Sequence, residues 1–251
     1  MSIWCTGDTH GNWMHRLNMD SFPEQKEMTK DDYVIVLGDF GIWDNSKREN
    51  YNLDWLNSRN FTTIFIAGNH SNYDILDSLP IEKWKGGEVN FIRPSVIHLR
   101  RGQVFTIEDK KFFAFGGASS HDIQDGIIDG FDPNWKDKAK SLDKQGKYMY
   151  RIKGLSWWEQ ELPTEEEMQT GLDNLAKHNN KVDFILSHSP STSQLYLLGG
   201  KGLYEPDRLS NYLEEIRVNT EYKKHFMGHM HINKAINDKD IVLYEQIVRI
   251  N

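Results

Sequence analysis

The chain has 251 residues, a formal net charge of −7 at pH 7 and a sequence pI near 5.8. That length allows one or two domains. The acidic balance argues against a surface that binds duplex nucleic acid or anionic membranes, because both of these partners are negatively charged. No apolar run approaches the ~20 residues of a membrane-spanning helix, and the first residues lack the basic segment and apolar core of a signal peptide. Cys5 is the single cysteine and cannot form an internal disulfide, so we expect a cytoplasmic protein.

The first set of predicted strands consists of short apolar runs that end directly in clusters of Gly, Ser, Asp or His residues. They cover residues 3–6, 33–37, 63–67, 183–186 and 225–227. These runs show little polar–apolar alternation, which indicates burial on both faces of a sheet that is covered by helices.

Helical patterns lie between these strands, over residues 13–19, 48–57, 165–178 and 206–216. The helix that starts at residue 165 has a predicted capping box, because Thr164 precedes it, Glu167 follows three residues later and acidic side chains fill its first turn. Strand–helix alternation over residues 1–80 favours a layered α/β domain.

The middle of the chain differs in texture. Short strands over residues 96–99, 103–108 and 111–115, joined by tight turns at 101–102 and 109–110, predict antiparallel hairpins. Residues 119–163 are rich in Asp, Lys, Gly and aromatic residues and show no clear pattern. A connection of that length inside a compact domain is usually a functional loop or a small cap. We expect a single domain over residues 1–251, in which the segment 119–163 lies near the substrate.

Chemically reactive side chains gather in short fragments at the predicted strand exits. The fragments are GDTHGN (7–12), GDFG (38–41), GNH (68–70), SHSP (187–190) and GHMH (228–231). In an extended loop, residues i and i+2 point the same way, so Asp8 and His10 can share a cation, as can His229 and His231. A lone histidine at such a place is more often structural than a ligand, but repeated clusters of one chemistry favour a metal site.

The remaining fragments add ligands of the same kind. Asp39 follows a buried run, at the sheet edge where open α/β sheets place their ligands, and its two oxygens can bridge two cations. Asn69 offers a neutral oxygen, His188 follows the predicted strand 183–186, and His70 can either bind metal or donate a proton. Mixed oxygen and nitrogen ligands suit Mn²⁺, Fe or Zn²⁺ better than Ca²⁺.

In this order the fragments closely resemble the calcineurin-like metallophosphoesterase superfamily, whose pattern is D-x-H, G-D, G-N-H, H and G-H-x-H. The residues 148–158 and the following Glu-Gln-Glu-Leu-Pro resemble a small bacterial and phage branch of it. The resemblance implies a four-layer α/β/β/α sandwich, in which two mixed sheets are flanked by helices, with a dinuclear metal centre at one sheet edge. The implied ligands of the first metal are Asp8, His10, Asp39 and His231, and those of the second are Asp39, Asn69, His188 and His229.

The resemblance also implies an activity. Asp39 would bridge two divalent ions, Mn²⁺ being favoured over Fe or Zn²⁺, and the ions would activate a hydroxide that attacks a phosphomonoester or phosphodiester. His70 would face the leaving-group oxygen and protonate it. We expect the substrate to be a small phosphorylated molecule or a phosphoprotein, with no duplex nucleic acid and no membrane as partner. The alternatives are a nuclease or nucleotide phosphodiesterase of the same superfamily, and a catalytically weak regulatory protein that binds metal or nucleotide.

Two departures from the protein Ser/Thr phosphatases of this superfamily concern His70 and the phosphate. Those enzymes carry G-D-x-V-D-R-G and G-N-H-E, whereas this chain has no arginine in the fragment 38–44 and has Ser71 after G-N-H. By proximity in sequence, Asp44 and Asp74 are candidate orienting partners of His70.

Candidate substrate contacts come from the segment 119–163. Ser120, His121 and Asp122 are candidates for the pocket wall, and Arg151 could clamp a phosphate with its planar fork of donors. A surface arginine beside aromatic residues is the plainer alternative for Arg151.

Overall fold

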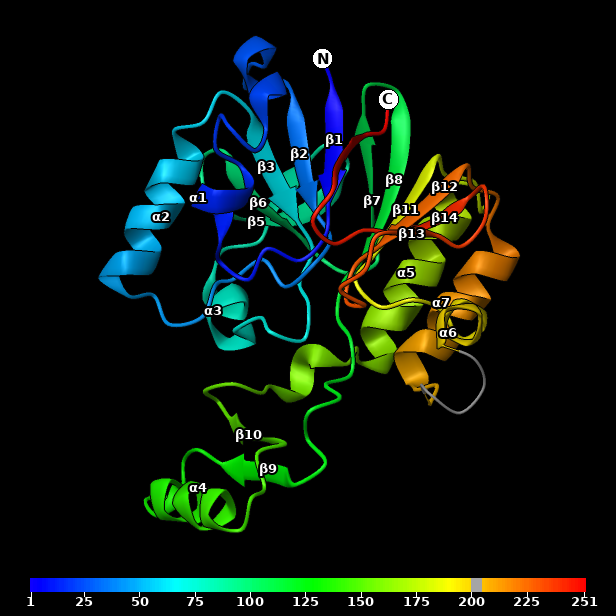
Figure 1. The fold of residues 1–251 in the computed structure, drawn as a ribbon. Coiled ribbons are helices and arrows are strands. Elements are labelled where there is room, and N and C mark those ends of the chain that lie inside the picture. The colour runs from blue at the N-terminus through cyan, green and yellow to red at the C-terminus, as the bar shows by residue number, and fades with distance from the viewer. Residues whose placement is uncertain (200–204) are drawn as a thin grey trace.

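The computed structural model describes residues 1–199 and 205–251. Two large sheets pack face to face and helices cover their outer faces (Figure 1), which confirms the predicted four-layer α/β/β/α sandwich. The first sheet has the strand order β15-β1-β2-β3-β6-β5-β4, in which β1, β2, β3 and β6 are parallel. Its strands are β1 (Ile3–Thr6), β2 (Tyr33–Val36), β3 (Thr62–Phe65), β4 (Glu82–Trp84), β5 (Gly87–Arg93), β6 (Val96–Leu99) and β15 (Ile247–Arg249).

The second sheet has the order β13-β14-β12-β11-β8-β7, and its four central strands are parallel. Its strands are β7 (Gln103–Ile107), β8 (Lys110–Phe115), β11 (Phe184–Ser187), β12 (Lys224–Met227), β13 (Lys234–Ala235) and β14 (Asp240–Val242). The strands predicted at the five fragments are therefore all present, with ends that differ from the prediction by at most two residues.

The outer layers are helical. The first sheet is covered by α1 (Trp13–Arg16), α2 (Lys47–Asn57) and α3 (Tyr73–Ser78). A short 3₁₀ helix, η1 (Pro23–Glu27), comes between α1 and β2 in the chain. The second sheet is covered by α5 (Glu165–Lys177) and α7 (Arg208–Asn219), with α6 (Thr192–Gly199) beside α7. The capping box predicted for α5 is confirmed: Thr164 Oγ1 accepts from Glu167 N at 3.2 Å, and the Glu167 carboxylate accepts from Thr164 N at 2.8 Å.

Strand β2 shows how the sequence builds two of the three apolar layers. Val34 and Val36 pack with the helices of the outer layer, whereas Tyr33 and Ile35 pack in the layer between the two sheets. Because successive side chains of a strand point to opposite faces, a strand buried on both faces has to be apolar throughout, as β2 is. Among the described residues, no helix combines the length and apolar character needed to cross a bilayer.

One of the two predicted hairpins is wrong. Strands β6 and β7 belong to different sheets, so the turn at residues 101–102 is a crossover between sheets, and the antiparallel partner of β6 is β5. The second hairpin, formed by β7 and β8, is confirmed. Its two-residue turn is Glu108–Asp109, with φ of 50° and 59°, the left-handed geometry that favours tight hairpins. Short apolar runs look alike in sequence, and tertiary packing decides which of them pair.

Residues 119–163, which we call the arm, leave the sandwich and return to it (Figure 1, green). The arm contains β9 (Gly126–Asp129), α4 (Trp135–Lys144), β10 (Tyr150–Lys153) and η2 (Glu159–Glu161). Strands β9 and β10 pair in parallel as a separate two-stranded sheet. That this segment serves as a substrate cap remains a prediction.

A buried histidine on β12 makes the fold sensitive to acid. His225 is held as a neutral ring, because Ser187 Oγ lies 2.7 Å from its Nε2 and Gln194 Nε2 donates to its Nδ1 at 3.1 Å. Burial lowers the pKa of His225 from 6.5 to about 4.

We expect the free energy of unfolding of the metal-free protein to fall by about 2 kcal/mol between pH 7 and pH 5 because of His225. The unfolded chain takes up this proton below its ordinary pKa of 6.5, whereas the folded chain does so only near pH 4. The stabilisation is therefore complete above pH 6.5 and is lost as the pH falls towards 4. Urea unfolding of wild type and His225→Gln at both pH values measures the effect. An equal pH dependence in both proteins would contradict it.

Candidate metal centre

The predicted ligands converge where the parallel strands of both sheets end. Asp8 and His10 follow β1, Asp39 follows β2 and Asn69 follows β3 in the first sheet. His188 comes at the end of β11 in the second sheet, and two further histidines follow β12. The seven predicted ligands thus come from loops at one edge of the sandwich: Asp8, His10, Asp39, Asn69, His188, His229 and His231.

Four of these side chains form a compact first group. One ligand atom from each of Asp8, His10, Asp39 and His231 lies within 4.8 Å of the others. His231 Nε2 is 3.1 Å from Asp8 Oδ2 and 3.1 Å from His10 Nε2. Asp8 Oδ2 is buried and makes no hydrogen bond of regular geometry with the described residues, although His231 Nε2 lies within ion-pair distance of it. Buried carboxylate oxygens are normally satisfied, so the unpaired oxygen beside two imidazoles fits a divalent cation.

A second group faces the other side of Asp39. His188 Nε2 lies 3.2 Å from Asn69 Oδ1 and 3.5 Å from Asp39 Oδ1. His188 Nδ1 donates to Leu37 O at 2.7 Å, which leaves Nε2 for this group. The buried ring of His229 lies 5.0 Å from the ring of His188, centroid to centroid.

Asp39 stands between the two groups. Its Oδ2 is 3.9 Å from His10 Nε2, whereas its Oδ1 faces His188 and accepts from His70 N at 2.8 Å. The two oxygens of one carboxylate therefore point to separate sets of ligands.

Glycines at the strand exits let these side chains approach so closely. A Cβ on Gly68 would lie 2.1 Å from Asp39 Oδ1, and a Cβ on Gly228 would lie 2.4 Å from Asp8 Oδ1. Contacts this short are forbidden, so any larger residue at either position would displace a carboxylate. The glycines of the G-N-H and G-H-x-H fragments are thus part of the site.

Backbone strain is concentrated at the same place. Four of the seven side chains come from residues with positive φ: His10 at 46°, Asp39 at 43°, His229 at 66° and His231 at 49°. Residues other than glycine rarely adopt this conformation, and it is held only where the surrounding structure requires it.

The charges of the site favour cation binding. Burial opposes ionisation of Asp39, but His188 and other imidazoles nearby hold the pKa of this carboxyl well below its usual range. Burial also disfavours a charged His188, yet Asp39 and Asp8 outweigh it and raise the pKa of His188 to about 9. Without a cation, the His188 proton therefore supplies the positive charge that the carboxylates require.

The neighbour of His70 is an arginine of the arm. Arg151 Nη1 lies 3.0 Å from His70 Nδ1, and Nη2 lies 3.1 Å from Nε2. The two predicted partners are engaged elsewhere: Asp44 accepts from Ser46 N at 2.9 Å, and Asp74 accepts from Trp158 Nε1 at 2.8 Å. The proposal of Asp44 and Asp74 from sequence proximity is therefore wrong, because the chain supplies the neighbour from strand β10.

The two predicted substrate residues lie together beside His70. The Asp122 carboxylate accepts from Arg151 Nε at 2.8 Å and from Nη2 at 2.5 Å. This pairing fixes the plane of the guanidinium at the edge of the metal site. Their contact with substrate remains a prediction.

Residues behind the ligands support them, and among these Glu161 carries no recognisable sequence signal, whereas Ser120 was a candidate for the pocket wall. Ser120 Oγ accepts from Asn69 Nδ2 at 3.3 Å and donates to Glu161 Oε2 at 2.6 Å. The buried Glu161 therefore orients Asn69 through Ser120. Burial raises the pKa of Glu161. Ser71 Oγ accepts from Gly68 N at 3.0 Å and thereby holds the G-N-H loop.

Arg101 ties the arm to the strand exits. Its buried guanidinium donates to Gly116 O at 2.9 Å, to Tyr73 Oη at 2.8 Å and to Gln160 O at 2.8 Å. An arginine at the end of an apolar strand reads in sequence as an ordinary turn residue, so this role was missed.

One of three comparisons with known proteins identifies a family. The sequence model of the family described as calcineurin-like phosphoesterase matches residues 1–233. No curated protein matches the chain. Among solved structures, the phosphopantetheinyl hydrolase from Mycobacterium tuberculosis is 15% identical with a TM-score of 0.43, over 97% of this chain and 88% of that chain. Because the family match spans most of its length, the chain belongs to the calcineurin-like phosphoesterases and is a metal-dependent hydrolase of phosphoric esters.

Proposed function

We propose that this phosphoesterase holds two divalent metal ions, Mn²⁺ being favoured, and hydrolyses a phosphomonoester or phosphodiester of a small molecule or phosphoprotein. The position of Asp39 carries the proposal. Its Oδ2 faces His10 of the first ligand group and its Oδ1 faces His188 of the second. A carboxylate with one oxygen toward each group is suited to bridging two cations.

The ligand residues divide into two sets around this bridge. Asp8, His10 and His231 complete the first set, and the second set is completed by Asn69, His188 and His229. Two divalent ions bound there supply Lewis acidity, which polarises the phosphoryl oxygens and lowers the pKa of water.

The remaining steps fall to residues of the chain. His70 lies 4.0 Å from Asp39 Oδ2 through its Nε2, close enough to the centre to give a proton to the departing ester oxygen. Arg151 stands beside it with fixed donors and binds a phosphoryl oxygen in place of the arginine that the fragment 38–44 lacks. Burial lowers the pKa of His70, although Asp39 opposes this shift.

Metal counting and hydrolysis test this proposal together. Protein loaded with Mn²⁺ is expected to contain two metal ions per chain by mass spectrometry and to hydrolyse p-nitrophenyl phosphate or bis(p-nitrophenyl) phosphate. EDTA should remove the activity and added Mn²⁺ should restore it. One ion per chain at saturation would contradict the bridged pair. Failure to hydrolyse either ester or a panel of nucleotides and phosphopeptides would contradict the assigned reaction.

A further inference from the structure

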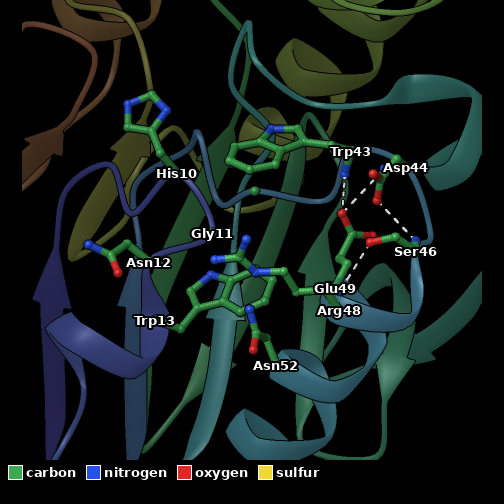
Figure 2. A pocket seen from close by; sticks show the side chains of 11 residues that line it. His10, Gly11, Asn12, Trp13, Trp43, Asp44, Ser46, Arg48, Glu49 and Asn52 are labelled. Carbon is green, nitrogen blue, oxygen red and sulfur yellow. Dashed lines mark hydrogen bonds between the residues drawn. The ribbon is translucent and has the colours of Figure 1, made fainter.

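A pocket of about 410 Å³ opens directly beside the metal centre (Figure 2). Its wall includes the metal-site residue His10, the loop after β2 and the first turns of α2. Pockets for small ligands commonly have ~300–1,000 Å³. The rings of His10 and His70 lie 5.4 Å apart, centroid to centroid, so the pocket starts next to the proton donor.

Trp43 forms a fixed aromatic wall of this pocket. The residue is 41% exposed, although the indole Nε1–H donates to His70 O at 3.0 Å. Its backbone N donates to the Glu49 carboxylate at 2.7 Å, which also accepts from Asn45 N at 3.1 Å. The indole is therefore held in place with a large apolar surface open to solvent. Such a surface is suited to stacking against a planar ring.

Polar side chains without partners complete the lining. Figure 2 shows Arg48 extending into the pocket, with Asn12 and Asn52 at its margin. Within residues 1–199 and 205–251, no hydrogen bond or ion pair involves these three side chains. Together they offer a guanidinium and two amides to a ligand that carries both donors and acceptors.

The charge of the lining decides between a neutral and an anionic ligand. Arg48 is the single cation among the lining residues, whereas Asp44 and Glu49 are both acidic. A second phosphate in the pocket would meet more negative than positive charge. A neutral, polar and planar group fits this lining better.

We propose that this pocket binds the nucleoside part of a nucleoside monophosphate, with the base against Trp43 and its polar edge and ribose toward Arg48, Asn12 and Asn52. The inference rests on the proposed function and names its substrate class. In the reaction a water oxygen bonds to phosphorus as the bond from phosphorus to the ribose oxygen breaks. His70 gives its proton to the ribose oxygen, and a proton from the water replaces it. The products are a nucleoside and inorganic phosphate.

The proposed nucleoside subsite is tested by comparing nucleoside 5′-monophosphates with ribose 5-phosphate, which carries the same phosphate but no base. At least one of the four common nucleoside 5′-monophosphates is expected to exceed ribose 5-phosphate in kcat/KM by about tenfold or more, the scale of one stacked base. The corresponding nucleoside 5′-diphosphate should show no gain over the monophosphate. Equal kcat/KM for ribose 5-phosphate and all four nucleotides, or a preference for the diphosphate, would overturn the inference.

Variants locate the selectivity in the pocket. Trp43→Ala and Arg48→Ala should each lower the ratio of nucleotide to ribose 5-phosphate kcat/KM by about tenfold. Tyr51→Ala and Lys47→Ala are matched controls, because these exposed residues of α2 lie outside the pocket lining, and they should leave the ratio unchanged. An unchanged ratio in both pocket variants would overturn the assignment.

A binding measurement separates this inference from the proposed function. Saturation-transfer NMR with the four nucleosides on EDTA-treated protein should detect contact with at least one base in wild type and lose it in Trp43→Ala. If no ester is hydrolysed, the proposed function fails and this measurement alone decides the subsite. If ribose 5-phosphate is hydrolysed but no nucleoside contacts the protein, the subsite fails and the phosphoesterase stands.

Discussion

Replacing Asp39 with asparagine is expected to reduce phosphoester hydrolysis on the order of a thousandfold or more. The change is nearly isosteric, but it removes a negative charge that lies between both ligand groups, within 3.9 Å of His10 Nε2 and 3.5 Å of His188 Nε2. An amide also offers one oxygen where the carboxylate offers two. The variant therefore cannot bridge two cations in the same way.

Metal content and kcat/KM measured on the same sample check this expectation. Asp39→Asn should hold fewer ions than wild type at equal free Mn²⁺. Asp31→Asn, an equivalent change at an exposed aspartate, should match wild type in both measurements. Circular dichroism should show the same secondary structure in all three proteins. Full metal content together with activity within tenfold of wild type would refute the bridging role.

The parts of the site that the sequence predicts well are local. Each ligand fragment lies at or shortly after the end of a short, largely buried strand, and in β2 and β11 all four strand residues are buried. A strand that is apolar on both faces is recognisable without a partner, and parallel strands bring their carboxyl ends to one edge. The order of the strands in the first sheet need not be known for Asp8, Asp39 and Asn69 to be placed at the same edge.

What the sequence could not predict depends on contacts between distant segments. Arg151 lies beside His70 although 81 residues of chain separate them, whereas proximity in sequence points to Asp44 and Asp74. Likewise, β6 pairs with β5 rather than with β7. The sequence cannot predict this choice, because each of these short apolar runs could pair with any other. Local patterns therefore locate the ligands but not the residues that orient them.

The sequence does not predict the elements of the arm, for a related reason. Helix α4 buries only Ala139, and most of its residues are charged or polar. Strands β9 and β10 form a two-stranded parallel pair with mostly exposed or half-buried residues. Elements that bury so little apolar surface leave little pattern in the sequence.

His70→Ala provides the second large effect, a fall in turnover of about a hundredfold or more. The loss should be greatest for alkyl phosphates and smaller for p-nitrophenyl phosphate, because a good leaving group needs little help from a proton donor. Metal content should stay at the wild-type value, since both ring nitrogens of His70 lie within 3.1 Å of the Arg151 guanidinium.

The pair of readouts separates the two roles that the sequence leaves open for His70. If His70 is a proton donor, His70→Ala should lower turnover more for esters with more basic leaving groups and should leave the metal content unchanged. If His70 is a metal ligand, the variant should contain less metal and should hydrolyse all esters more slowly by the same factor. His15→Ala is the matched control, because this histidine is exposed on α1. The approach of the Arg151 guanidinium to within 3.0 Å of Nδ1 disfavours a metal ion on that nitrogen, and the same positive charge contributes to the lowered pKa of His70, which makes a protonated His70 a stronger acid.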